Sequence, residues 1–427
     1  MDWYQQLQQY IRSRIDLRQT QLERLDETAM ATLIASVLAS PEAQALIPDA
    51  AVGAHHLSSN LSDTSLQQRV IDDLLGFGVL AALLRDPDVA EIMVNGPQQI
   101  YVERHGRLQL SPLQFQDESA VRQVVERMVA VVGRRIDTAS PMVDTRLACG
   151  ARVNIVIPPL AIHGSYITVR KFSQHMRSVQ ALCEQGSCSP QLAEFLELAV
   201  AAKQNLIVCG GTGTGKTTLL NILANWIAPT ERVITIEDSA ELRLAHAHLV
   251  SLEARPANQE GEGAVSIRQL VINALRMRPD RIVVGECRGG ESLDMLQAMN
   301  TGHAGSMTTL HANTPRDGLR RLEVMVMMAG MELPLLAIRQ QISSAIDIIV
   351  QLKRLPNGAR IISQVTEVQG IEGDTMMLAD IYNLRHGSHL ASESEQDAQP
   401  TGDIPMFLHQ QPEAIRQRAL ALLAIAV

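Results

Sequence analysis

One glycine-rich stretch constrains the fold of this chain more than any other part of its sequence. Residues 210–217 read GGTGTGKT, which matches the pattern GxxxxGK[ST] at every fixed position. Glycines let the backbone wrap around phosphate groups without Cβ clashes, and the N-terminus of a following helix attracts the anion. An apolar segment, 206–208, precedes the stretch, and a helical segment, 217–227, follows it. This strand, loop and helix context predicts a nucleotide phosphate site.

The expected contacts with the nucleotide come from consecutive residues of this loop. Lys216 is expected to bind the β and γ phosphates of ATP, and the Thr217 hydroxyl is expected to ligate Mg²⁺. ATP and Mg²⁺ are therefore the expected ligands. The other predicted contacts are those of Gly210, Gly211, Thr212, Gly213, Thr214, Gly215 and Thr218.

Strands and helices alternate after the phosphate loop. Apolar strand segments are expected at 233–236, 281–284 and 306–310, and helices at 266–277 and 292–300. A further helix is expected after Thr314, which is a favourable N-cap, with Pro315 in the first turn and Gly330 just past the end. The alternation predicts a mostly parallel sheet that is covered by helices on both faces.

The part of the chain before the loop predicts separate units. Residues 1–60 are expected to form a helical segment and a linker, because 48–64 are rich in Ser, Asn, His and Gly. Residues 61–175 mix strand and helix patterns and predict an α/β domain, followed by a hinge at 176–190. The nucleotide-binding domain is expected at 191–427, with a polar surface excursion at 388–405 and a terminal helix at 419–427.

Composition limits the function classes that remain. The net charge of −9 and the pI of about 5.8 disfavour nucleic acid as a direct partner. The five cysteines are scattered and are expected to be free thiols. The sequence has no signal-peptide pattern and no apolar run of the roughly 20 residues that span a bilayer. No integral membrane segment is expected, so a membrane link would act through a partner.

Acidic residues follow two of the expected strands, where open α/β sheets bind ligands. Glu286 follows Gly285 at the end of 281–284, where a Walker B strand usually delivers an Asp. We expect Glu286 to act on the attacking water, although a surface Glu after a core strand is the alternative. Glu237 is a candidate for orienting this water, and Asp238 for supporting the metal shell. A solvated acidic helix start is the alternative for Asp238.

Two histidines frame the expected strand 306–310. His303 and His311 are candidates for sensing the γ-phosphate or stabilising the charge that develops. Ordinary core or surface histidines are the alternative. Three arginines in the preceding α/β domain, Arg146, Arg152 and Arg170, are candidates for reaching the nucleotide. Spacing alone favours surface ion pairs for them.

These blocks together resemble the type II/IV secretion ATPase superfamily, and within it the Tad/Flp pilus-assembly branch (CpaF/TadA-type). Before the phosphate loop the resemblance includes LLRDPDVAEIMVNGPQQIYVERHGRL, SPMVDTRL, RVNIVIPPLAI and ITVRKF. From the loop onward it includes GGTGTGKTTLLN, ITIEDSAEL, LRMRPDRIVVGECRGGES and MNTGHAGSMTTLHANTPRDGLRRLE. The similarity covers about 66–370, and the last of these blocks is highly specific to the superfamily.

The resemblance implies an α/β protein with a RecA-like P-loop NTPase domain, a PAS-like α/β domain before it and an N-terminal helical segment. It implies that Glu286 is the catalytic carboxylate and that Glu237 lies in an Asp box, His303 and His311 in a His box. The three arginines would belong to N-domain segments that reach the nucleotide. A homo-hexamer on the cytoplasmic face of the bacterial inner membrane is implied, acting with inner-membrane platform proteins.

Departures and alternatives limit this interpretation. The tetracysteine zinc module of type II secretion and type IVa pilus extension ATPases is missing, and Ala304 and Cys287 replace residues common in relatives. A type IV secretion or conjugation ATPase would use the same site, and a retraction motor is a further alternative. A DNA translocase or helicase on the same core is disfavoured by the acidic charge. A nucleotide-sensing scaffold is the non-enzymatic alternative.

Overall fold

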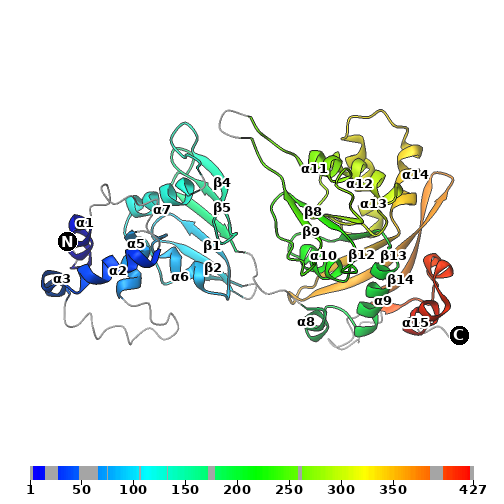
Figure 1. The fold of residues 1–427 in the computed structure, drawn as a ribbon, viewed down its shortest axis with the longest axis horizontal. Coiled ribbons are helices and arrows are strands. Elements are labelled where there is room, and N and C mark those ends of the chain that lie inside the picture. Colours follow the sequence, from blue (N-terminus) through cyan, green and yellow to red (C-terminus); the bar gives the residue numbers. More distant parts are fainter. Residues whose placement is uncertain are drawn as a thin grey trace. The chain divides into compact units, whose positions relative to one another are not determined.

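In the computed structural model, the chain folds into two compact units, Met1–Gln174 and His175–Val427 (Figure 1). The structure describes residues 3–14, 27–47, 66–74, 76–104, 107–131, 133–171, 178–257, 262–384 and 398–423. The whole of the predicted linker, 48–64, lies outside this part of the chain. Each unit has a sheet and apolar cores of its own.

The first unit begins with helices that share a small apolar core. The helices are α1 (Trp3–Arg14), α2 (Glu27–Leu38), α3 (Pro41–Leu46) and α5 (Leu66–Leu74). Leu7, Ile34 and Val70 from three of them are fully buried in one cluster. The Ser40 hydroxyl caps α3 by accepting a hydrogen bond from the Ala43 N–H. The helical pattern expected at the N-terminus is therefore present.

A six-stranded antiparallel sheet forms the rest of the first unit, in the order β3-β2-β1-β6-β5-β4. Its strands are β1 (Val89–Asn95), β2 (Ile100–Arg104), β3 (Arg107–Leu110), β4 (Met142–Arg146), β5 (Arg152–Val156) and β6 (Tyr166–Arg170). The helices beside them are α6 (Leu80–Arg85) and α7 (Glu118–Ala130). Val121, Val125 and Met128 of α7 join the buried apolar face of this sheet.

The second unit is built on a nine-stranded sheet in the order β15-β14-β13-β12-β7-β11-β10-β8-β9. Strands β12 to β9 in this order run parallel, and β13, β14 and β15 extend the sheet in antiparallel fashion. The parallel strands are β7 (Leu206–Cys209), β8 (Val233–Glu237), β9 (Leu249–Glu253), β10 (Arg281–Val284), β11 (Met307–Leu310) and β12 (Ile348–Arg354). The others are β13 (Arg360–Glu372), β14 (Thr375–Leu384) and β15 (Ala398–Pro400).

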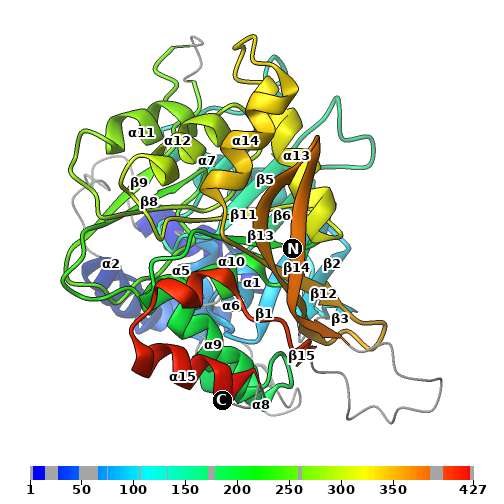
Figure 2. The same cartoon turned by 90° about the vertical axis from the view of Figure 1, so that its right-hand side faces the viewer.

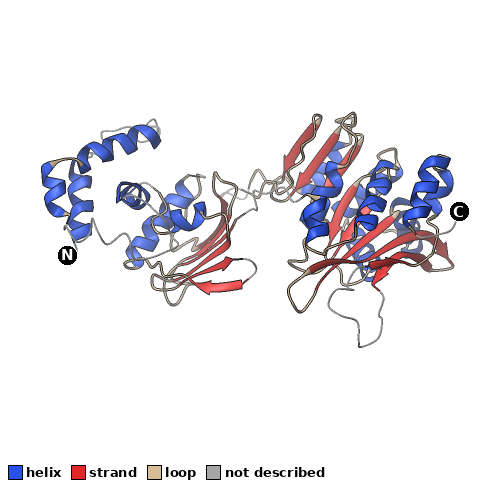
Figure 3. Cartoon of the chain, turned by 90° about the horizontal axis from the view of Figure 1, so that it is seen from below, coloured by secondary structure: helices blue, strands red, loops and turns tan. Residues whose placement is uncertain are grey.

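Helices cover both faces of this sheet because its central strands are apolar on both sides. In β7, Leu206 and Val208 join one buried cluster, while Ile207 and Cys209 join another. The first cluster takes in α9 (Pro190–Ala201), α10 (Lys216–Asn225) and α15 (Glu413–Leu422). The second takes in α11 (Ile267–Ala274), α12 (Glu291–Asn300), α13 (Pro315–Met327) and α14 (Leu335–Ala345). Figure 2 shows the two helix sets, and Figure 3 shows the helices packed over the strands.

Most elements expected near the phosphate loop are present with small shifts at their ends. Thr314 caps α13, its hydroxyl accepting the Asp317 N–H, and Gly330 has a φ of 78° past the helix end. Two expectations need correction. The predicted hinge contains α8 (Val179–Glu184), whose Val179 packs against the core of the second unit. The predicted polar excursion contains β15, which pairs with β14.

Candidate active site

The phosphate loop connects β7 to α10 in the way that its sequence predicts. Gly213 and Gly215 have φ values of 71° and 96°, which side chains with a Cβ rarely adopt. Gly215 is the N-cap of α10 and no side chain caps this helix. The first N–H groups of α10 are therefore left for an anion, which is the arrangement that binds phosphates.

Lys216 is held over the loop by two acceptors. Its side chain is largely buried, and Nζ donates to the Gly211 carbonyl at 3.0 Å and lies 3.2 Å from His311 Nε2. A lysine ammonium only donates, so Nε2 must accept and His311 must be neutral in this contact. Burial, together with the charge of Lys216, holds the pKa of His311 below its usual value, which is consistent with the neutral form. The ammonium is thus poised beside the loop that would hold the phosphates.

Glu286 lies next to this pair, at the turn after β10. Its Oε1 is 3.3 Å from His311 Nε2, and Oε1 is buried without a hydrogen bond from the described part of the chain. Its Oε2 accepts a hydrogen bond from Arg288 Nε at 2.7 Å and lies 2.5 Å from Arg288 Nη2 in an ion pair. The structure therefore brings together Lys216, His311 and Glu286, three of the residues that the sequence singles out.

Glu237 is the last residue of β8, and its side chain accepts hydrogen bonds from the backbone of the following loop. It is 3% exposed, and its Oε1 accepts the N–H groups of Glu241 at 2.8 Å and Leu242 at 3.0 Å. Burial raises the pKa of Glu237 to about 7 despite these hydrogen bonds. A Cβ on Gly285 would lie 2.9 Å from Glu237 Cγ. This contact explains why a glycine stands before Glu286 at the strand end.

His303 does not join the phosphate loop of its own subunit. It precedes β11, so it lies at the amino edge of the parallel strands, whereas His311 follows β11 at the carboxyl edge. Its Nδ1 donates to the Pro279 carbonyl at 2.9 Å. The two histidines therefore lie at opposite ends of β11, about 13 Å apart along a strand of four residues, and only His311 contacts the phosphate loop.

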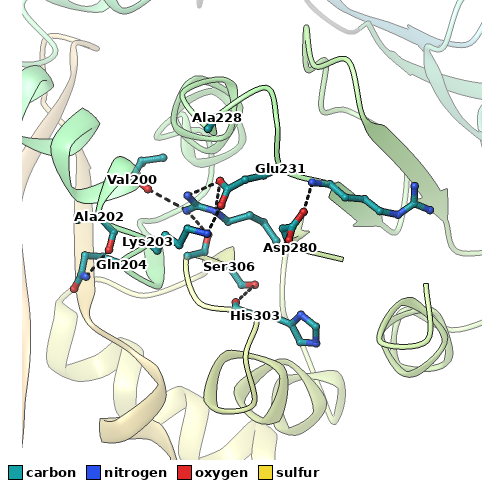
Figure 4. A network of polar contacts seen from close by, with 12 residues as sticks. Val200, Ala202, Lys203, Gln204, Ala228, Glu231, Asp280, His303 and Ser306 are labelled. Atoms are coloured by element: carbon teal, nitrogen blue, oxygen red, sulfur yellow. Dashed lines mark hydrogen bonds and ion pairs between the residues drawn. The ribbon is translucent and has the colours of Figure 1, made fainter. Parts of the chain in front are cut away.

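The amino edge around His303 contains a buried ion-pair network (Figure 4). Arg281 is 1% exposed, and its guanidinium pairs with Glu231 at 2.8 Å and donates to the Val200 and Gly305 carbonyls. Glu231 also pairs with Lys203 at 2.5 Å, and these partners lower the pKa of Glu231 against the effect of its burial. A Cβ on Gly305 would lie 2.0 Å from Arg281 Nη1. These contacts indicate a structural role for this edge.

The three candidate arginines lie side by side in the first unit. Arg146 pairs with Arg152 between β4 and β5, and Arg152 pairs with Arg170 between β5 and β6. We call this set the arginine row. Arg146 Nε donates to the Gly150 carbonyl at 3.0 Å, and Arg170 Nε lies 3.7 Å from Glu91 Oε1. Like charges directly opposite one another destabilise a sheet, and Arg170 also pairs with Glu91 of β1 on its other side.

Sequence reasoning missed three arginines near the site. Arg288 follows Glu286 by two residues, and this spacing was the available signal. Arg354 Nη1 lies 3.8 Å from the position of a Cβ on Gly213, and Arg360 Cδ lies 3.8 Å from that on Gly215. Arg354 and Arg360 come from the β12 and β13 ends and are far from the loop in sequence. No local pattern could therefore have found them.

The phosphate loop fits a magnesium ion bound jointly with a nucleotide. No group of three or more His, Cys, Asp or Glu side chains in the described residues is arranged to hold a metal ion. Mg²⁺ usually takes only one or two protein ligands beside phosphate oxygens. Thr217, in the first turn of α10 and partly exposed, is suited to this role.

Comparison with known proteins places this geometry in a family. The family model of the type II/IV secretion system protein matches residues 73–379. The chain belongs to this family. It is 30% identical to the conjugal transfer protein TrbB of Rhizobium radiobacter over 329 residues, covering 76% of this chain and 97% of TrbB. It is 38% identical to the type IV secretion system protein PtlH of Bordetella pertussis over 303 residues, covering 64% of this chain and 88% of PtlH.

A solved ATPase structure agrees with the fold. The Yersinia pseudotuberculosis ATPase DotB has a TM-score of 0.50 and 20% identity, covering 74% of this chain and 82% of that chain. The second unit of this secretion family member is thus a RecA-like P-loop domain. None of the described helices of the chain is long and apolar enough to cross a membrane.

Proposed function

We propose that this protein hydrolyses MgATP and uses the energy to power a secretion machine of the Tad/Flp pilus-assembly type. One observation carries the enzymatic part. Lys216, His311 and Glu286 meet within 3.3 Å at the carboxyl ends of parallel strands, beside a complete phosphate loop. This combination supplies a phosphate-binding cation and a carboxylate with a free buried oxygen.

The residues divide the work of an in-line phosphoryl transfer. The loop N–H groups and Lys216 bind and orient the phosphates, and Thr217 would hold Mg²⁺, which neutralises charge on the phosphates when bound. The water oxygen attacks the γ-phosphorus, the bond to the β–γ bridging oxygen breaks, and Glu286 Oε1 accepts the proton of the water. ADP and phosphate are the products. When Lys216 turns from His311 to the γ-phosphate, Nε2 of the neutral imidazole is released. With the ring proton on Nε2, His311 can then donate a hydrogen bond to the γ-phosphate.

The arginine row is proposed to complete the site from the first unit. Its three positive charges lie in register, and phosphoryl transfer is accelerated by arginines that approach the γ-phosphate. The row would act within a homo-hexamer in which the first unit closes over a nucleotide. His303 is proposed to act indirectly, through β11, which it precedes, or at the nucleotide site of a neighbouring subunit.

The Tad/Flp assignment is favoured by the sequence blocks that resemble this branch, and by the absence of a tetracysteine module. A type IV secretion or conjugation ATPase is the second candidate, because TrbB and PtlH carry those names. The proposed location is the cytoplasmic face of the bacterial inner membrane, where the protein binds platform proteins. Capture of the inner-membrane partner by the tagged protein distinguishes the two: a pilus platform protein supports the first candidate, and a conjugation channel protein the second.

The enzymatic proposal is tested by phosphate release from ATP with the purified chain. Lys216→Ala is expected to abolish turnover by removing phosphate binding. Glu286→Gln is expected to abolish turnover while ATP binding is retained, because the amide keeps its shape but accepts no proton. Light scattering with and without ATP measures the proposed hexamer. Wild-type hydrolysis rates in the Glu286→Gln variant would contradict the assignment.

A further inference from the structure

Hydrogen bonds to Glu291 fix the backbone of the turn after β10. Glu291, the first residue of α12, accepts the backbone N–H of Arg288 at 2.6 Å and that of Gly289 at 2.8 Å on its Oε1. The backbone of Arg288 is therefore tied to the start of a helix. A side chain that leaves this turn starts from a defined position.

The guanidinium of Arg288 lies between carboxylates from two strand ends. Nε donates to Glu286 Oε2, Nη2 forms an ion pair with the same oxygen, and Nη1 lies 3.8 Å from Asp238 Oδ2. Glu286 follows β10 and Asp238 follows β8, and these strands are neighbours. The planar fork of an arginine fixes direction as well as charge, which a lysine does not do.

This contact makes the two oxygens of Glu286 different. Oε2 is occupied by Arg288, whereas Oε1 is buried, receives no hydrogen bond from the described residues and lies 3.3 Å from His311. A glutamate without such a contact would sample several rotamers, and few of them would direct an oxygen toward Lys216 and His311.

We propose that Arg288 is a positioning residue, which holds Oε2 of Glu286 so that Oε1 faces the phosphate-loop side. This rests on the proposed role of Glu286 as the group that accepts the proton of the attacking water. Arg288 is 60% exposed, so its ion pair contributes little to stability. Its loss should therefore change the rate of hydrolysis and leave folding and ATP binding unaltered.

The test uses the full chain with Arg288→Gln, Arg288→Lys, Glu286→Gln and the double variant Arg288→Gln/Glu286→Gln. Arg416→Gln is the matched control, because Arg416 is also an exposed arginine paired with a carboxylate, Glu413, but lies on α15. Hydrolysis of labelled ATP is measured to steady state and in a single turnover. ATP affinity is measured separately by equilibrium binding, and folding by the thermal midpoint.

Arg288→Gln is expected to lower kcat by about 10- to 100-fold, the usual cost of losing a group that orients a reacting residue. KM and ATP affinity should change less than about twofold, and Arg288→Lys should recover part of the rate. In the Glu286→Gln background, Arg288→Gln should not lower the residual single-turnover rate any further, because the two act as a unit. Arg416→Gln should match the wild type.

Five results would overturn the proposal. An unchanged rate in Arg288→Gln, with Glu286→Gln inactive, removes Arg288 alone and leaves the proposed function intact. A higher rate means that the ion pair restrains Glu286 instead of positioning it. Weaker ATP binding at unchanged kcat means that Arg288 binds phosphate, and an equal loss in both backgrounds means a general structural role. Wild-type rates in Glu286→Gln refute the proposed function, and the inference with it.

Discussion

Gly285 is the residue whose small size has the clearest structural reason in the site. It stands where a Walker B strand usually places an Asp, and Glu237 of the neighbouring strand occupies the space that a side chain would need. The proposed catalytic carboxylate, Glu286, is consequently one residue further along. The sequence indicated this shift but did not explain it, because the explanation is a contact between β8 and β10.

A Gly285→Ala variant tests this packing. Its Cβ would lie 2.9 Å from Glu237 Cγ, and overpacking of this kind costs about 1–3 kcal/mol. We expect a lower urea midpoint together with slower ATP hydrolysis, since Glu237 also holds the Glu241–Leu242 backbone. Unchanged stability would show that the site has room to adjust.

Glu237 should also make stability depend on pH. Its pKa is raised from 4.5 to about 7, so the folded chain binds this proton more tightly than the unfolded chain. The contribution to the free energy of unfolding is fully present below pH ~4.5 and is lost as pH rises through about 7, by roughly 3 kcal/mol. Glu237→Gln keeps a neutral side chain, so its stability relative to the wild type should rise between pH 5 and 8. Parallel urea midpoints across this range would contradict the burial argument.

The strands and helices around the loop followed from local patterns, and the contacts between distant elements did not. The cap of α13 by Thr314 and the buried strand β10 were predictable from residue type and periodicity. The β13–β14 hairpin and β15 were not predicted, because their partners are fixed by tertiary pairing.

The same contrast between local pattern and long-range contact applies to the two histidines. The sequence pattern places His303 and His311 at opposite ends of one strand, as the structure does with β11. The contact of Lys216 with His311 was not available from the sequence, because it joins residues far apart in the chain.

The buried ion pair between Arg281 and Glu231 at the start of β10 can be tested by mutation. Arg281→Met leaves Glu231 buried with only Lys203 as its charge partner, and breaking a buried pair costs about 3–5 kcal/mol. We expect a large drop in the urea midpoint. Arg281→Met/Glu231→Leu should recover much of it, because neither charge is then left alone. A double variant no more stable than the single one would mean that the network orders the edge in another way.

For the whole molecule, catalysis would require both units, although each has a sheet of its own. Arg152→Ala removes the middle of the arginine row and is expected to lower kcat by about 10- to 1000-fold, with ATP affinity of the second unit retained. Arg107→Ala on exposed β3 is the control and should match the wild type. Equal rates in the two variants would exclude the row from the reaction.

The central position of β11 has a consequence for measuring how these units work. Strand β11 is paired on both sides, with β7 and β10, and all four of its residues are buried. Its amide hydrogens should exchange with deuterium only when the second unit opens as a whole. The turn after β10 can exchange through local opening. Comparing the two rates in one sample would separate nucleotide-dependent motion at the candidate active site from the overall stability of the second unit.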